Sequence, residues 1–241
     1  MPKTTQKAEC SSKQRSVPLR GKESSLHHSL KFHYTGAGGV IEAQVGPYVC
    51  DGLTSSGEII EVQTGSLGPI KEKVFFLAKN GKVRIIHPIV NHKYIELFDS
   101  GGNFLHSRKS PRKGKTWDLF KSLVYAPELA LLKNTTIELA VIDIREKRIS
   151  DGSGSWWRKG VRVADRFLET WHSSVVLSRR SDYCNFIPFK KNESFTAREF
   201  AKNAGINARL AGKTLYVLTK IGLVEKTGKQ GNTFIYKRAR S

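Results

Sequence analysis

Residues 40–63 read VIEAQVGPYVCDGLTSSGEIIEVQ, and this stretch decides the fold of the chain. It contains three short runs typical of strands, at 40–45, 48–53 and 58–64, and the third is rich in β-branched residues. Gly46-Pro47 separates the first two runs, and a polar loop ending at Gly57 separates the second from the third. Runs of this kind between turn residues predict three consecutive strands joined by tight hairpins.

A helix is expected on each side of the three strands. Upstream, Leu26, Leu30 and Tyr34 recur at intervals of four, which predicts a helix over 24–35. Downstream, apolar residues at helical spacing predict a second helix directly after the third strand. Residues 82–89 (KVRIIHPI) form an apolar run typical of a buried strand. The predicted order is therefore helix, three strands, helix, strand.

Three acidic residues stand out in this part of the chain. If the first turn holds two residues, paired positions have residue numbers that add up to 93, and Glu42 lies opposite Asp51. If the next loop closes a second hairpin, the sum is about 111, and Asp51 lies beside Ile60 or Glu61. Neighbouring carboxylates repel each other, and a Mg²⁺ ion, which prefers oxygen ligands, would offset that repulsion. Gln63 falls on the same face as Glu61.

Asp51, nine further residues and then Glu61-Val62-Gln63, in this order of elements, resemble the PD-(D/E)XK nuclease superfamily over residues 24–90. The resemblance implies an α+β fold with a restriction-endonuclease-like core built on a mixed sheet. It implies Asp51 and Glu61 as ligands of Mg²⁺, for which Mn²⁺ would substitute, and Glu42 as a further ligand or water-orienting acid. Gln63 stands where the family usually has Lys, as in its E-x-Q variants, and would complete the catalytic set.

Two other interpretations of the acidic residues stay open. The acids could be solvated on a surface hairpin and paired with Lys71 or Lys73. Alternatively, the nuclease-like fold could be retained for binding alone.

The rest of the chain divides into an N-terminal arm, an extension of the first domain, and a C-terminal domain. Residues 1–22 are polar and basic, which predicts a disordered arm. The nuclease-like domain is expected over 23–190, with a hairpin in 94–115, helical structure broken at Pro127, a strand at 136–144 and a helix over 165–177. Residues 191–241 form the C-terminal domain.

Two short helices and a glycine-rich hairpin are expected at residues 194–239. Thr196-x-x-Glu199 is a capping-box pattern that begins the first helix. One face of the second helix is apolar, and the opposite face carries a basic stripe made of Arg209, Lys213, Tyr216 and Lys220. This arrangement resembles the winged helix-turn-helix family, which implies that the second helix enters the major groove of DNA and that Lys229 flanks the wing. A winged helix used for protein contacts is the alternative.

The charge of the chain points to a polyanionic partner. Lys and Arg number 41 against 21 Asp and Glu, which gives a net charge of +20 and a pI of about 10.0. A membrane is a poorer partner because the sequence has no apolar run near 18 residues and no basic amphipathic helix with an aromatic face. Further DNA contacts are expected from a basic loop and from an aromatic pair, at Arg108, Lys109, Arg112, Lys113, Trp157 and Arg158. A solvated loop is the alternative for the first group.

The sequence therefore predicts a metal-dependent DNA endonuclease positioned by a winged helix. A DNA-binding protein without catalysis is the main alternative, and an RNA-processing nuclease is a third. Cutting both strands of a duplex requires two active sites, which is compatible with a homodimer. The cysteines at 10, 50 and 184 show neither zinc-ligand nor disulfide spacing, so an intracellular location in cytoplasm, nucleoid or nucleus is expected.

Overall fold

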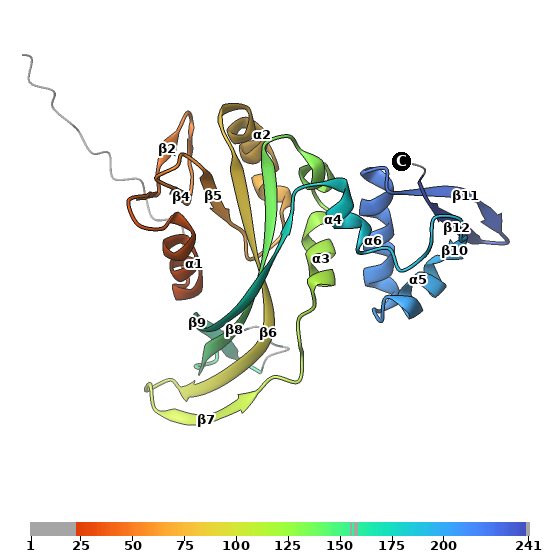
Figure 1. Ribbon diagram of the computed structural model, residues 1–241. Coiled ribbons are helices and arrows are strands. Elements are labelled where there is room, and N and C mark those ends of the chain that lie inside the picture. Colours follow the sequence, from red (N-terminus) through yellow and green to blue (C-terminus); the bar gives the residue numbers. More distant parts are fainter. Residues whose placement is uncertain (1–22, 155, 157–158, 240–241) are drawn as a thin grey trace, which may run out of the picture.

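A computed structural model of the protein describes residues 23–154, 156 and 159–239, and the expected N-terminal arm lies outside them. Figure 1 shows a long, curved sheet with helices packed against its upper half and a separate group of helices and strands at the C-terminal end. The lower halves of the longest strands extend beyond the helices as a curved arm (Figure 1). The protein is therefore a mixed α+β structure, as the sequence predicted.

The main sheet has the strand order β1-β4-β5-β6-β8-β9, and β7 pairs with the lower half of β6. Its strands are β1 (Val40–Ile41), β4 (Gly52–Leu53), β5 (Ile59–Val62), β6 (Val83–Asp99), β7 (Phe104–Lys109), β8 (Thr135–Ser150) and β9 (Val161–Leu177). β5, β6 and β8 run parallel, whereas the pairs β1–β4, β4–β5, β6–β7 and β8–β9 are antiparallel. The sheet is therefore mixed.

The predicted pairing of the first hairpin is confirmed. Val40 pairs with Leu53, and in a separate small ladder β2 (Gln44–Val45) pairs with β3 (Tyr48–Val49), so the residue numbers add up to 93 in both. Glu42 interrupts the hairpin because its φ of 54° lies in the left-handed region. In the second hairpin Gly52 pairs with Ile60, which places position 51 across from position 61.

Helices cover the two faces of the sheet, and β5 contacts both layers because its side chains alternate. On one face, α1 (Ser25–Thr35) buries its leucines against residues such as Ile60. On the other, α2 (Lys71–Asn80), which follows η1 (Gly68–Ile70), packs against residues such as Ile59. Among the described residues, no helix combines the length and apolar character needed to cross a bilayer.

The prediction of a helix over 165–177 is wrong, because this segment is the second part of β9. It pairs with β8 along its whole length, and its β-branched residues suit a strand. β6 is also longer than expected, since it joins the predicted strand at 82–89 to the predicted hairpin beyond it. Helical structure in 116–133 breaks before Pro127 as expected, giving η2 (Thr116–Asp118), α3 (Leu119–Leu123) and η3 (Pro127–Leu131).

The C-terminal unit comprises residues 180–239. Its elements are α4 (Arg180–Cys184), β10 (Phe195–Thr196), α5 (Ala197–Asn203), α6 (Ala208–Lys220), β11 (Val224–Gln230) and β12 (Thr233–Arg238). The part from 194 onward has two helices followed by a hairpin, as predicted, whereas α4 and β10 are additional elements. The capping box between Thr196 and Glu199 is present. Trp117 touches the rings of Phe186 and Phe200, with centroids 5.1 Å and 6.0 Å away, and one continuous apolar core joins this unit to the α2 side of the sheet. The unit is thus packed firmly against the rest of the protein.

Candidate carboxylate site and basic surfaces

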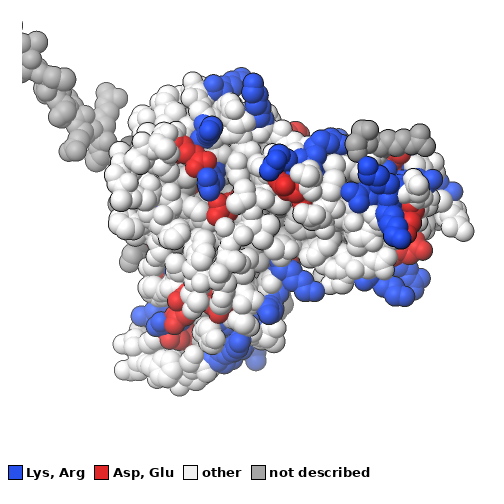
Figure 2. All heavy atoms as spheres, viewed as in Figure 1, with Lys and Arg blue, Asp and Glu red and all other residues white. Residues whose placement is uncertain are grey.

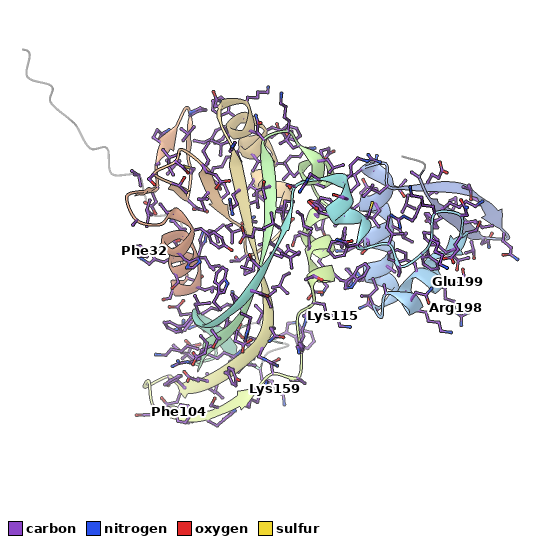
Figure 3. All side chains as sticks on the ribbon, in the orientation of Figure 1. Phe32, Phe104, Lys115, Lys159, Arg198 and Glu199 are labelled. Carbon is purple, nitrogen blue, oxygen red and sulfur yellow. The ribbon has the colours of Figure 1, made fainter. Side chains whose placement is uncertain are left out.

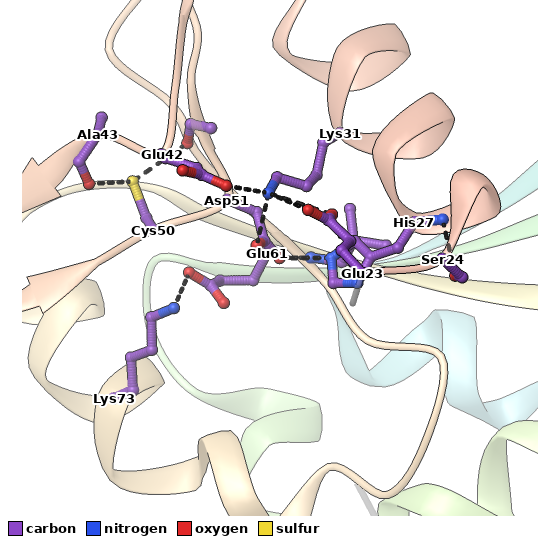
Figure 4. Close-up of polar contacts among 12 residues, drawn as sticks. Glu23, Ser24, His27, Lys31, Glu42, Ala43, Cys50, Asp51, Glu61 and Lys73 are labelled. Atoms are coloured by element: carbon purple, nitrogen blue, oxygen red, sulfur yellow. Dashed lines mark hydrogen bonds and ion pairs between the residues drawn. The ribbon is translucent and has the colours of Figure 1, made fainter. Parts of the chain in front are cut away.

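Asp51 is fixed at the point where the first hairpin meets β5. Its Oδ2 accepts a hydrogen bond of 2.8 Å from the Val62 backbone N–H and lies 3.1 Å from His27 Nε2 (Figure 4). Lys31 Nζ is 3.7 Å from Oδ1. Burial alone would raise the pKa of this carboxyl group, but the hydrogen bonds and positive charges outweigh burial and lower the pKa. Asp51 is therefore an oriented, ionised carboxylate.

Glu61 projects from β5 toward α2 and is only 3% exposed. Its Oε1 lies 2.6 Å from Nζ of Lys73, which α2 supplies (Figure 4). Burial raises the pKa of Glu61 to about 7, and the nearby Asp51 carboxylate acts in the same direction, although Lys73 opposes both. Glu61 thus titrates near neutral pH, which is unusual for a glutamate.

Glu42 is turned toward α1. Its side chain is 61% exposed, and its Oε1 pairs with Lys31 Nζ at 3.0 Å. Lys31 is almost fully buried and also lies 3.2 Å from Glu23. Burial would lower the pKa of Lys31, but Glu42, Glu23 and Asp51 together raise it. Lys31 is therefore a charged lysine that holds three carboxylates around it.

Gln63 uses its side chain locally. Its Nε2 donates a hydrogen bond of 2.5 Å to the Ser66 carbonyl, which fixes the loop after β5. Its own carbonyl oxygen lies 2.7 Å from Nδ1 of His87, a buried residue of β6. The expected catalytic role of Gln63 would require this amide to leave Ser66.

The expected arrangement of Glu42, Asp51 and Glu61 around one ion is not present. Within the described residues, no three side chains of His, Cys, Asp or Glu are grouped so that they could hold a metal ion. The reason is the ion pairs, because Lys31 holds Glu42 and Lys73 holds Glu61. Asp51, directly before β4, nevertheless remains a neighbour of Glu61 on the adjacent strand β5. Two carboxylates fit Mg²⁺, which commonly takes one or two of them and completes its shell with water and substrate phosphate.

His27 and Lys31 are site residues that the sequence analysis did not identify. They are four residues apart and lie on one face of α1, and Glu23, just before the N-cap of the helix, continues the interval of four. That face is next to the apolar face that carries Leu26 and Leu30. The spacing was thus visible in the sequence, but the contact with Asp51 depends on how α1 packs on the sheet.

The basic stripe on α6 is partly free and partly engaged. Arg209 and Lys220 are exposed, and Tyr216 is 47% exposed. Lys213 is half-buried, with Nζ 5.4 Å from the ring centre of Tyr125, which precedes η3. The basic stripe of α6 therefore contacts the segment before η3 through the exposed ring of Tyr125.

The other predicted DNA contacts lie on exposed segments. Lys229 is on β11, Arg108 and Lys109 end β7, and Arg112 and Lys113 lie in the loop that follows. Trp157 and Arg158 lie outside the described residues. On the face drawn in Figure 2, Lys and Arg side chains gather over the C-terminal unit and along the lower arm, where acidic side chains lie among them.

Three comparisons place the chain among known proteins. A protein of Treponema pallidum (strain Nichols), described as uncharacterized, is 25% identical over 218 residues, which cover 90% of this chain and 86% of the relative. No solved structure matches the chain. A family described as a domain of unknown function (DUF8091) matches residues 24–178, which run from the N-cap of α1 to the end of β9. Through this match over more than half of its length, the chain belongs to the DUF8091 family.

Proposed function

We propose that the protein is a metal-dependent DNA endonuclease whose C-terminal unit is a DNA-binding winged helix. One observation carries the proposal: Asp51, directly before β4, lies across from Glu61 on the neighbouring strand β5, and burial brings the pKa of Glu61 to about 7 beside Lys73. A buried acid with a strongly raised pKa, next to a second acid and a cation, is typical of a functional site.

Each residue of the carboxylate site, defined as Asp51 and Glu61, has a role in this proposal. Asp51 is held in one orientation and kept ionised, so it is ready to bind a cation. Glu61 would bind the same cation in its ionised form. A bound Mg²⁺ would polarise the scissile phosphate and lower the pKa of a water molecule. Lys73 would turn from Glu61 to the phosphate and supply the positive charge that Gln63 lacks.

The fold supports the same proposal. The chain enters β5 through antiparallel hairpins, crosses through α2 and continues in the parallel strand β6, which is the order that the sequence resemblance implied. α5, α6 and the β11–β12 hairpin follow the order of a winged helix, with β10 pairing to β12. The net charge of +20 would attract DNA to the basic stripe of α6.

A DNA-binding protein without catalysis is the second candidate. The ion pairs of Lys31 with Glu42 and of Lys73 with Glu61 favour it, because they balance the acids without a metal ion. In that case the acids would hold α1, α2 and the sheet together.

Glu61→Gln separates the two candidates, because it removes the charge and keeps the size of the side chain. Glu128→Gln is the matched control, since Glu128 also pairs with a lysine of α2, Lys71, but is exposed. On supercoiled, nicked, branched and single-stranded DNA with Mg²⁺ or Mn²⁺, we expect the wild type and Glu128→Gln to cut. Glu61→Gln should cut about 100-fold more slowly or worse and bind DNA with unchanged affinity. Absence of wild-type cleavage on every substrate, or equal cleavage by Glu61→Gln, would favour the non-catalytic protein.

A further inference from the structure

A cavity of about 320 Å³ lies in a notch of the main sheet. β6 pairs with β5 as far as Ile86 and with β7 only from Tyr94 onward. Between these positions, the described residues give that edge of β6 no strand partner. The loop after β7 crosses the notch instead, with the Gly114 N–H donating a hydrogen bond of 2.7 Å to the Val90 carbonyl. We call this space the notch cavity.

One side of the notch cavity is apolar. Leu26 comes from α1, Pro88 and Val90 from β6, and Ile144 from β8. Pro88 has no N–H to donate, so the open edge of β6 at this point needs no strand partner. These side chains form a wall suited to a flat apolar group such as a nucleobase.

Next to this apolar wall lies the buried carboxylate of Glu146, two residues after Ile144 on the same face of β8. Arg148 lies 2.6 Å from Glu146 Oε1, Arg166 lies 2.9 Å from Oε2, and Lys93 lies 3.5 Å from Oε1. Arg112, from the loop that crosses the notch, lines the cavity as well. Three cations thus share one carboxylate, and Arg112 adds a fourth cation to the cavity.

The residues that line the cavity carry more positive than negative charge. Asp118 forms an ion pair with Lys121, and Asp165 accepts hydrogen bonds from Ser25 at the start of α1. The charged side chains that line the cavity are three cations, Lys93, Arg112 and Arg166, against two carboxylates, Asp118 and Glu146. Burial lowers the pKa of Lys93, and the two neighbouring arginines lower it further despite Glu146. An anion bound here would relieve this excess of positive charge.

We propose that the notch cavity binds a nucleoside 5′-monophosphate unit, with the base against the apolar wall and the phosphate on Arg112, Arg166 and Lys93. Guanidinium groups bind phosphate through paired hydrogen bonds. The volume is at the lower end of the range for small-molecule sites, which suits a single nucleotide. The unit could be a free nucleotide or the 5′-phosphorylated end of a DNA strand, because both present the same chemistry.

The position of the cavity connects it to the carboxylate site without making it part of that site. Thr64, which follows Gln63 directly, lines the cavity. His87 also lines it and contacts the Gln63 carbonyl. Neither Asp51 nor Glu61 is among the lining residues. Binding of a nucleotide therefore requires no metal and no cleavage.

The test is calorimetric titration of the full chain with 2′-deoxyadenosine 5′-monophosphate in EDTA. Arg112→Gln and Arg166→Gln should each weaken binding about tenfold, since each removes a charged hydrogen bond to the phosphate. Arg145→Gln is the matched control, because Arg145 neighbours Glu146 on β8 but pairs with Glu169 outside the cavity, and it should bind like the wild type. Glu61→Gln should bind like the wild type as well, which separates this proposal from the nuclease proposal.

Competition against the bound nucleotide distinguishes the two sources of the ligand. Displacement by a 5′-phosphorylated octanucleotide and not by its 5′-hydroxyl form would identify a strand end, and displacement by neither would identify a free nucleotide. Four results would overturn the proposal: no saturable binding at millimolar nucleotide, equal binding by all variants, equal affinity for deoxyadenosine or inorganic phosphate, or equal displacement by both oligonucleotides. Arg112 is exposed, so Arg112→Gln should fold normally, and circular dichroism checks this.

Discussion

The raised pKa of Glu61 predicts a specific pH dependence of stability, which Glu61→Gln removes. In the unfolded chain the pKa of Glu61 returns to 4.5, whereas in the folded protein burial holds it at about 7. The native state therefore favours the neutral carboxyl group. This contribution to stability is fully present below pH 4.5 and is lost as the pH rises through 7.

The size of the effect follows from the two pKa values. A difference of about 2.5 pKa units corresponds to about 3 kcal/mol. Glu61 is 3% exposed, so solvent screening takes little from this value. The free energy of unfolding of the wild type, relative to that of Glu61→Gln, should thus fall by about 3 kcal/mol between pH 4.5 and pH 8.

Urea denaturation followed by circular dichroism, at several pH values and without divalent ions, measures this difference. The comparison uses the change in the free energy of unfolding with pH and not its absolute value, because Glu61→Gln also removes the ion pair with Lys73. Glu128→Gln should run parallel to the wild type between pH 6 and pH 8, since the pKa of Glu128 is lowered from 4.5 and lies far below that window. Parallel curves for the wild type and Glu61→Gln would refute the idea that Glu61 is a strained, buried acid.

Two further predictions concern the loop over the notch and the basic stripe. Gly114→Ala should destabilise the protein by about 1–3 kcal/mol in urea denaturation, because the added Cβ would clash with the Val90 backbone. In Gly212→Ala on α6, the added Cβ meets nothing within 4 Å, so this control should raise the free energy of unfolding by up to about 1 kcal/mol. If Arg209 and Lys220 contact phosphate, Arg209→Gln and Lys220→Gln should each reduce the magnitude of the negative slope of log DNA affinity against log salt concentration by about 1. An unchanged slope would show that the substituted residue does not contact phosphate.

The sequence predicted those parts of the fold that depend on residues close to one another along the chain. The register of the first hairpin, the helix over 24–35 and the capping box at Thr196 are local, so the turn residues and the spacing of apolar residues are sufficient to predict them. β9 was mistaken for a helix because its strand structure depends on pairing with β8 along its whole length. The spacing of apolar residues within 165–177 carries no information on the pairing of β9 with β8.

The candidate site was predictable to a similar extent. The pairing of hairpins placed Asp51 beside Glu61 correctly, since strand register is fixed by the turns. The capture of Glu42 by Lys31 could not be predicted, because it depends on the left-handed backbone at Glu42 and on the packing of α1 against the sheet. The notch cavity depends on where β5 ends and β7 begins relative to β6, which only the assembled sheet shows. Figure 3 shows the segment around Lys115 that leads from the β6–β7 arm to α3.

The most direct test of the nuclease proposal is a crystal of the protein soaked in Mn²⁺, with data collected for anomalous scattering. The proposal predicts an anomalous peak between the carboxyl groups of Asp51 and Glu61, with Lys73 displaced from Glu61. Absence of a peak there, with Lys73 still paired to Glu61, would contradict the proposal and would leave a basic protein whose acids only hold its fold together.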